Sequence, residues 1–98
     1  MGANDMNIQV NTQLIELARL KAVATRLVND LVELSDERDT VTKVDGNWIH
    51  IDFVGRGSEQ FNLELSDAYS IQTRINYLTD NINNLSKIKS YILECLAA

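Results

Sequence analysis

Hydrophobic residues follow one spacing at both ends of this chain and a different spacing in the middle. Between residues 12 and 34, and again between residues 71 and 96, they recur every three or four positions, which is the period of an amphipathic helix. Between residues 48 and 65 they alternate with polar residues, which is the period of a strand with one buried face. The pattern therefore predicts an α+β domain: a helix, an antiparallel β-meander of two or three strands, and a long second helix.

The alternating segment has the sequence WIHIDFVGRGSEQFNLEL. Gly55 and Gly57 lie between its two alternating runs, an arrangement typical of a β-hairpin. The residues expected on the buried face are Ile49, Ile51, Phe53, Phe61, Leu63 and Leu65. We expect His50, Asn62 and Glu64 to be exposed. Because an isolated hairpin is only marginally stable in water, its apolar face should pack on a helix.

A further strand is expected over Thr40 to Val44, where β-branched residues dominate. Asp45-Gly46-Asn47 follows it, and an Asp-Gly pair between two such runs is a good turn signal. With this strand the sheet becomes a three-stranded antiparallel meander.

The first helix is expected to begin at Asn11 or Thr12, either of which could cap it, and to end near Leu34. Its apolar seam has nearly heptad spacing and comprises Leu17, Leu20, Ala24, Leu27, Leu31 and Leu34. The second helix is expected to start with Ser66 as N-cap and Asp67 in the first turn, where a negative charge is favoured. It should run unbroken to Ala97, since the chain contains no proline.

The second helix carries a longer seam, formed by Ile71, Ile75, Leu78, Ile82, Leu85, Ile88, Ile92 and Leu96. This seam is longer than a short sheet and one helix would be expected to cover. We therefore predict a homodimer at micromolar concentration. The alternative is that the seam is simply the core of the monomer.

Length and composition favour one ordinary domain over residues 1–98, because 45% of the residues are hydrophobic and 23% are charged. We expect residues 1–7 to be disordered or derived in part from an expression vector, in which case Met1 to Asp5 are the added residues and the native start is Met6. No secretory signal and no membrane-spanning run is recognised in the sequence. A single cysteine, Cys95, allows no intramolecular disulfide, which suits a reducing cytoplasm.

The charge balance is acidic, with 14 Asp and Glu residues against 9 Lys and Arg residues. This balance argues against nucleic acid or an anionic membrane as the direct partner. The most concentrated acids are Asp30, Glu33, Asp36, Glu37, Asp39 and Asp45. Either they form a solvated helix end and loop, or they form a docking patch for a basic protein. Carboxylates near a helix C-terminus are slightly unfavourable, which favours the second interpretation.

The residues that could carry out chemistry are few. His50 and Asp52 share one face of the expected hairpin, but no nucleophile lies near them in sequence, so we interpret His50 as a surface residue. Cys95 lacks a setting that lowers a thiol pKa. No cluster has metal-ligand spacing. We therefore expect no enzyme activity, no metal and no cofactor. Trp48 either packs under the first helix or anchors a binding surface.

The segments SEQFNLELSDAYSI and NYLTD resemble the C-terminal part of small phage anti-CRISPR proteins of the type I-F class. The resemblance implies a non-catalytic inhibitor that occupies a basic groove of a nucleic-acid-handling complex. The groove-facing acids that it implies are Glu59, Glu64, Asp67 and Asp80. Arg74, Lys87 and Lys89 interrupt the acidic row of the second helix, which favours blocking of a protein surface over strict imitation of phosphates.

Two further resemblances imply different functions. Phe53-Val54-Gly55 is similar to the W-x-G turn of WXG100 secretion proteins, which would imply a helical-hairpin secretion partner. The segment VTKVDGNWIHI followed by a heptad helix is similar in layout to a prefoldin subunit, which would imply a chaperone. The leading hypothesis is a binding protein whose partner is a basic protein surface of a larger complex, without direct contact to nucleic acid or membrane.

Overall fold

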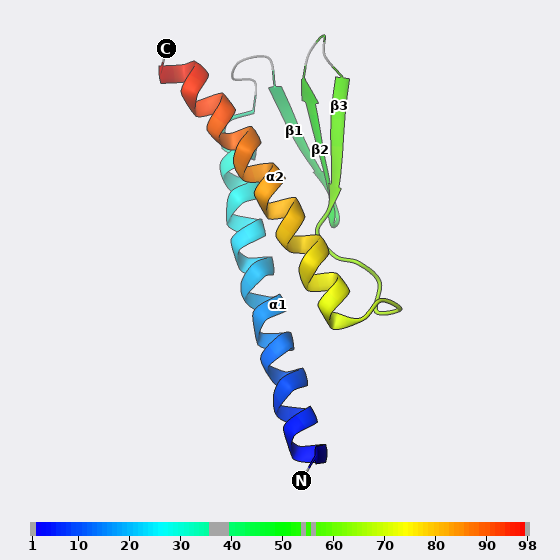
Figure 1. Cartoon of the computed structure of the whole chain (residues 1–98). Helices are drawn as coiled ribbons and strands as arrows, with labels where there is room; N and C mark the ends of the chain where they lie inside the picture. Colours follow the sequence, from blue (N-terminus) through cyan, green and yellow to red (C-terminus); the bar gives the residue numbers. More distant parts are fainter. Residues whose placement is uncertain (1, 36–39, 54, 56, 98) are drawn as a thin grey trace.

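A computed structural model describes residues 2–35, 40–53, 55 and 57–97, with the backbone alone for residues 2–10, 95 and 97. The predicted α+β arrangement is confirmed within these residues (Figure 1). The elements in chain order are α1 (Gly2–Glu33), β1 (Thr40–Asp45), β2 (Trp48–Phe53), β3 (Gly57–Asn62) and α2 (Ile71–Ala97).

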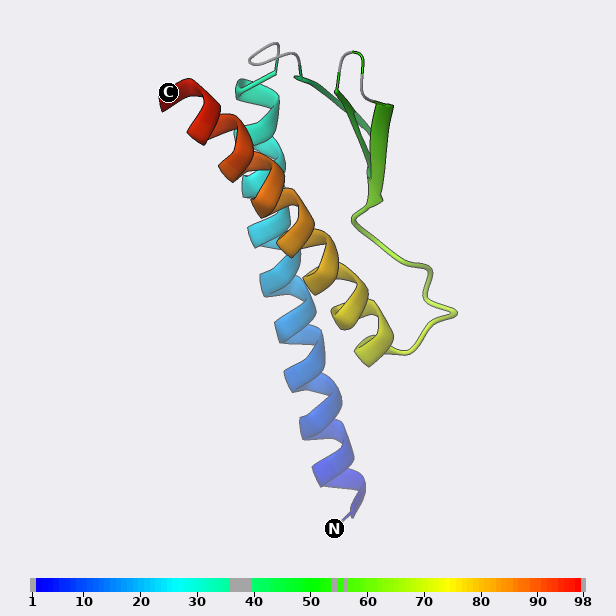
Figure 2. The ribbon, with the colours of Figure 1, turned by 45° about the horizontal axis from the view of Figure 1, so that its top comes forward.

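The two helices lie side by side and run in the same direction (Figures 1 and 2). Near the start of α2, Gln13 Nε2 donates a hydrogen bond to Gln72 Oε1 at 3.2 Å, across 59 residues of sequence. Near the end of α1, Lys89 Nζ donates to Asp30 Oδ2 at 2.8 Å, again across 59 residues. A constant separation at both ends means that the helices are parallel and in register.

Parallel helices follow from the number of strands between them. The sheet is an antiparallel meander in the order β1-β2-β3, so the chain reverses direction at every strand. An odd number of strands returns the chain in the direction of α1. The molecule is consequently elongated, 58 Å in its longest dimension, with a radius of gyration of 16.2 Å. A compact domain of 100 residues would have about 13 Å.

The first hairpin has the predicted position and a two-residue turn. Asp45 pairs with Trp48 in the ladder, which leaves Gly46 and Asn47 as the turn. Gly46 has a φ of 59°, a left-handed conformation that glycine adopts without steric cost. The extra strand expected over Thr40 to Val44 is therefore confirmed.

One face of the sheet covers the half of the helix pair that contains the C-terminal parts of both helices. Ile49, Ile51 and Phe61 are buried there, as predicted. The helical residues buried in the same cluster are Leu27, Val28, Leu31, Leu85 and Ile92. Towards the other end of the pair, Leu17, Leu20, Ala24 and Leu78 form a second cluster in which helix packs on helix.

The remaining residues of the predicted hairpin face are only partly buried. Phe53 and Leu63 pack against the core cluster, and Leu65 is half-buried beyond the end of β3 at Asn62. Of the residues expected to be exposed, Glu64 is exposed, whereas His50 and Asn62 are half-buried. At the ends of short strands, side chains on both faces are only partly buried. The alternation of buried and exposed residues therefore holds at the centre of the hairpin and not at its ends.

The predicted start of the first helix was wrong. The backbone of α1 is helical from Gly2, well before Asn11 and Thr12, and includes residues 2–7, for which the sequence predicted disorder. Neither proline nor glycine occurs between residues 3 and 10, so nothing in that stretch forces the helix to stop. A good capping residue is therefore not used as a cap when the helix can continue through it.

The N-cap of the second helix is Ser70, four residues after the predicted Ser66, and α2 begins at Ile71. Ser70 Oγ accepts a hydrogen bond from the Thr73 backbone N–H at 3.1 Å, the geometry of an N-cap. Ser66 instead closes a turn: its Oγ accepts from the Ala68 N–H at 3.2 Å, and its carbonyl accepts from the Tyr69 N–H at 3.1 Å. Both serines use the same local chemistry, and only one of them leads into the helix.

The long apolar seam of α2 is mostly core of the monomer, because α1 runs alongside it. Leu78, Leu85 and Ile92 are buried, and the partly buried Ile75, Ile82 and Ile88 pack against the core clusters. Leu96 is 42% exposed. The alternative interpretation of the seam as core is thus confirmed for most of its length, while the homodimer stays a prediction.

Candidate binding surface

The acids proposed to dock a partner are spread over separate parts of the molecule. Asp30 is paired with Lys89 between the helices, and Glu33 is exposed in the last turn of α1. Asp36, Glu37 and Asp39 lie outside the described residues, so the continuous acidic run expected from the sequence is described only at its two ends.

Trp48 lies at the turn end of the first hairpin, opposite Asp45 in the β1–β2 ladder. Its neighbour Ile49 is buried against the helices, so Trp48 belongs to the opposite face of the sheet. Trp48 is 45% exposed. It therefore does not pack under the first helix, and the second interpretation, a residue available to a partner, is the one that its position allows.

The carboxylate of Glu64 is hydrogen-bonded to two other residues of the domain. It accepts a hydrogen bond from Lys21 Nζ of α1 at 2.5 Å and one from Asn47 Nδ2 of the hairpin turn at 3.3 Å. The hydrogen bond and charge of Lys21 lower the pKa of Glu64 below its ordinary value. This carboxylate ties the sheet end to α1, so it is poorly placed to bind a partner.

Asp67 is similarly engaged. It lies in the segment between β3 and α2, where its carboxylate is 3.4 Å from the guanidinium of Arg74. Its side chain is nevertheless 96% exposed, and the pair is therefore of little energetic weight. Asp67 remains accessible at the start of α2.

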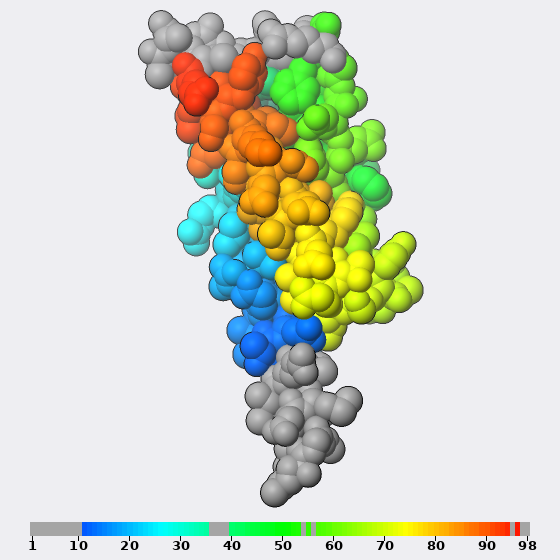
Figure 3. Space-filling view, viewed as in Figure 1, coloured from blue at the N-terminus to red at the C-terminus, as the bar shows by residue number. Residues whose placement is uncertain are grey.

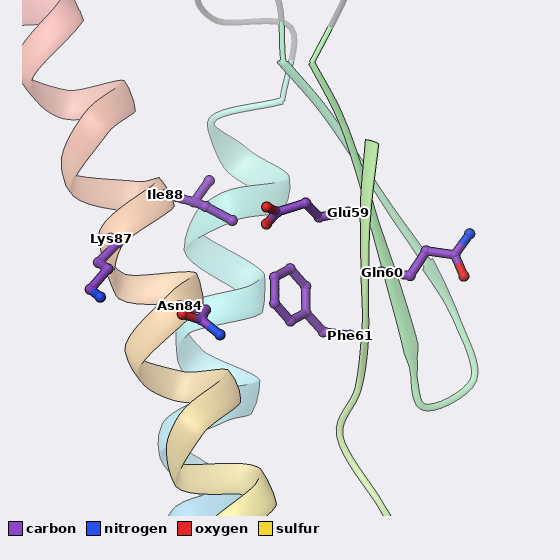
Figure 4. A pocket seen from close by; sticks show the side chains of 6 residues that line it. All are labelled: Glu59, Gln60, Phe61, Asn84, Lys87 and Ile88. Carbon is purple, nitrogen blue, oxygen red and sulfur yellow. The ribbon is translucent and has the colours of Figure 1, made fainter. Parts of the chain in front are cut away.

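Glu59 lines a groove of about 410 Å³ between β3 and α2 (Figure 4). In the ladder it lies opposite the buried Ile51, so its side chain is on the helix-facing side of the sheet although it is exposed at the edge. The other lining residues are Gln60 and Phe61 of β3 and Asn84, Lys87 and Ile88 of α2. Phe61 and Ile88 give the groove an apolar wall between two oppositely charged side chains, Glu59 and Lys87.

Asp80 belongs to the same side of the molecule. Residues three and four apart on a helix are neighbours on one stripe, so Asp80 precedes Asn84 and Lys87 along the rim of the groove. Figure 3 shows this face, with α2 in orange and yellow running beside the green of β3. Among the described residues, neither Asp80 nor Glu59 takes part in an ion pair. Of the proposed set, Glu59 thus lines the groove, and Asp80 lies one helical turn before the lining residue Asn84.

Asn81 was not singled out from the sequence. It is a buried residue of α2, and its Nδ2 donates a hydrogen bond of 2.8 Å to the backbone carbonyl of Asn62 at the end of β3. An asparagine at a helical position spaced like the core is the signal that could have identified it, because a buried amide requires a hydrogen-bond partner. Its contact fixes α2 against the outer edge of β3.

The outer face of the sheet carries the residues considered for catalysis. His50 and Asp52 line a shallow depression of about 420 Å³ together with Ser58, which lies opposite Asp52 in the ladder. The proximity of Ser58 to His50 and Asp52 was not predicted from the sequence. Among the described residues, the side chains of His50, Asp52 and Ser58 are not joined to one another by a hydrogen bond. The described part of the chain includes no group of three or more His, Cys, Asp or Glu side chains that could hold a metal.

No family model, no curated protein and no solved structure matches the chain at a significant level. In the part of the chain that the structure describes, neither helix is both long and apolar enough to cross a membrane. The segment compared with the W-x-G turn joins strands rather than helices, since β2 ends at Phe53 and β3 begins at Gly57.

Proposed function

We propose that this domain is a non-catalytic binding protein that occludes a basic surface of a larger, nucleic-acid-handling complex. The observation that carries the proposal is a groove with an apolar wall that the exposed Glu59 lines, with the exposed Asp80 one helical turn before the lining residue Asn84. Apolar contact area supplies affinity, while acids outside ion pairs speed association with a cationic surface and select for it. The net charge of −5 acts in the same direction.

The resemblance to type I-F anti-CRISPR proteins supports this choice of target and implies action in the cytoplasm. Two of the four acids that it implies are exposed: Glu59 lines the groove, and Asp80 lies one helical turn before Asn84 at its rim. The other two, Glu64 and Asp67, contact Lys21 and Arg74 instead. We therefore assign docking to Glu59 and Asp80 and a structural contact to Glu64.

The test is inhibition of a purified type I-F surveillance complex. We expect the protein to bind the complex and to lower its affinity for target DNA, and we expect this effect to weaken with salt, because exposed charges are screened over about 8 Å at physiological ionic strength. The double variant Glu59→Lys, Asp80→Lys should lose inhibition. Its matched control is Asp52→Lys, Glu94→Lys, which makes the same charge change at exposed positions away from the groove.

Two results would contradict the proposal. If target DNA binds equally well with and without the wild-type protein, the inhibitor function is wrong. If the groove variant inhibits as strongly as its control, Glu59 and Asp80 are not the docking acids.

A chaperone function of the prefoldin type is the second candidate. One observation favours it: two long helices are joined through strands, and the backbone of α1 extends past the first turn of α2 (Figure 1). A chaperone should suppress aggregation of a chemically denatured client such as citrate synthase, and should do so equally well with the Glu59→Lys, Asp80→Lys variant. Absence of suppression would remove this candidate.

A further inference from the structure

The free edge of β3 presents backbone groups to the groove beside α2. In the sheet order β1-β2-β3, β3 has a strand neighbour on one side only. The Leu63 N–H, just beyond β3, donates to the Asn47 carbonyl at 2.8 Å and so points towards the first hairpin. Backbone groups of successive residues in a strand point to opposite sides. The N–H and C=O groups of Ser58, Gln60 and Asn62 must therefore point away from β2.

The position of Asn81 confirms independently that the backbone carbonyl of Asn62 points away from β2. Its side-chain amide donates to the Asn62 carbonyl from the α2 side at 2.8 Å, and Asn81 is only 7% exposed. The amide of Asn81 thus stands where the N–H of an additional strand would stand. Beyond it, the outward backbone groups of Gln60 and Ser58 continue along the same edge. Gln60 borders the groove lined by Asn84, Lys87 and Ile88 with its backbone, while its side chain points to the outer face of the sheet (Figure 4).

We propose that this edge binds an extended peptide segment of the partner as a fourth strand, antiparallel to β3, in the groove beside α2. The proposal rests on the proposed binding function and specifies how the groove holds its partner. Main-chain hydrogen bonds to Gln60 and Ser58 give affinity, and every second side chain of the peptide faces the groove and gives specificity.

The two peptide positions that face the groove have predictable chemistry. The residue opposite Phe61 lies beside Ile88 and should be apolar, because apolar and aromatic cross-strand pairs are stabilising. The residue opposite Glu59 should be basic, because opposite charges directly across a ladder attract and like charges repel. In an antiparallel strand, the apolar residue comes first and the basic residue two positions later. The expected motif is apolar–any–Lys or Arg.

The probe is a displayed library of random nine-residue peptides selected on the immobilised full-length protein. We expect enrichment of the apolar–any–basic motif. Selection on the Glu59→Lys variant should shift the second position from basic to acidic, while the apolar position is kept. A shift of this kind would not follow from a merely structural role of Glu59.

The Gln60→Pro variant tests the backbone contact. Proline removes the outward N–H of Gln60 without removing a hydrogen bond to β2, and an edge strand tolerates proline where the N–H faces solvent. The matched control is Gln60→Ala, which keeps that N–H. For a peptide selected on the wild type, we expect Gln60→Pro to weaken binding about tenfold relative to Gln60→Ala. Circular dichroism, together with the NMR chemical shifts of residues in β2, verifies that both variants fold.

Three results would overturn the proposal. A library that yields no such peptide would mean that Glu59, as an inward-pointing charge, keeps the edge unpaired. Equal peptide affinity of Gln60→Pro and Gln60→Ala would exclude the backbone contact. Self-association of the wild type that Gln60→Pro abolishes would identify a second copy as the occupant. If peptides are selected as expected but the surveillance complex is not inhibited, the proposed target is wrong and the strand-edge site stands.

Discussion

Lys89 of α2 and Asp30 of α1 form an ion pair of 2.8 Å between two parallel helices. With side chains 32% and 38% exposed, the pair is only partly shielded from water. Such pairs contribute little to stability, although charge pairs between helices that pack on apolar seams can favour one relative orientation. The same 59-residue separation recurs at the hydrogen bond between Gln13 and Gln72.

We expect a coupling energy of about 0.2–1 kcal/mol between Asp30 and Lys89, because the pair is near the surface. A double-mutant cycle with Asp30→Asn, Lys89→Met and the double variant, measured by urea denaturation, gives this value directly. A coupling above about 2 kcal/mol would mean that the pair is a main determinant of helix association, contrary to the expectation for partly exposed charges.

Phe61 and Trp48 belong to the same small sheet but to opposite faces, and their truncations should differ. Phe61 is 7% exposed, and Phe61→Ala should lower the free energy of unfolding by about 3–5 kcal/mol. Trp48→Ala should cost about 1 kcal/mol or less, as is usual for exposed sites. Denaturation followed by circular dichroism compares the two variants. Equal losses would contradict the assignment of the two residues to a buried and an outer face.

The alternation of hydrophobic and polar residues was enough to predict the sheet and the buried residues at its centre. Ile49 and Ile51 are fully buried because both faces of a strand are fixed by a period of two. The same period places Glu59 on the side of Phe61, so the inward position of this acid could have been predicted from the sequence.

The direction of α2 depended on a strand that the sequence left optional. With two strands the helices would have been antiparallel, and with β1 they are parallel. The helix starts could not be predicted because Asn11, Ser66 and Ser70 offer the same capping chemistry, and tertiary packing decides among them. The contact between Asn81 and Asn62 required the three-dimensional register, which no local pattern encodes.

Asn81 should contribute more to stability than Asn84, its neighbour on the same side of α2. Asn81→Ala leaves the Asn62 carbonyl without its buried donor, so we expect a loss of about 1–3 kcal/mol in the free energy of unfolding. Asn84 is exposed on the groove, and Asn84→Ala should change stability by about 0.5 kcal/mol or less. Urea denaturation of both variants makes the comparison. A neutral Asn81→Ala would show that water replaces the amide at the edge of β3.

The contact between Lys21 and Glu64 should make stability depend on pH in the acid range. The folded protein holds the pKa of Glu64 below its ordinary value of 4.5, so the unfolded chain binds the proton more readily. The contribution of this group is therefore present above about pH 5 and is lost as the pH falls through the lowered pKa.

The Glu64→Gln variant should lose part of this pH dependence, while it keeps a polar side chain of the same size. The control is Glu16→Gln, because Arg19 lowers the pKa of Glu16 within α1 without joining two elements. Thermal unfolding between pH 3 and pH 7 is the measurement. If wild type and Glu64→Gln have parallel pH profiles, the contact with Lys21 does not stabilise the fold.

The predicted homodimer has less apolar surface available than the sequence suggested, because α1 buries most of the α2 seam. Leu93 and Leu96 remain 45% and 42% exposed, and they lie three residues apart on one side of the last turns of α2. We expect a dimer with micromolar affinity, measured by sedimentation equilibrium, which Leu93→Glu, Leu96→Glu dissociates without loss of helix content. Gln60→Pro should leave this dimer intact, because neither Leu93 nor Leu96 is among the residues that line the groove beside Gln60. A wild-type monomer throughout the micromolar range would remove the homodimer, and the exposed leucines would then be scattered apolar surface of the kind that monomers commonly carry.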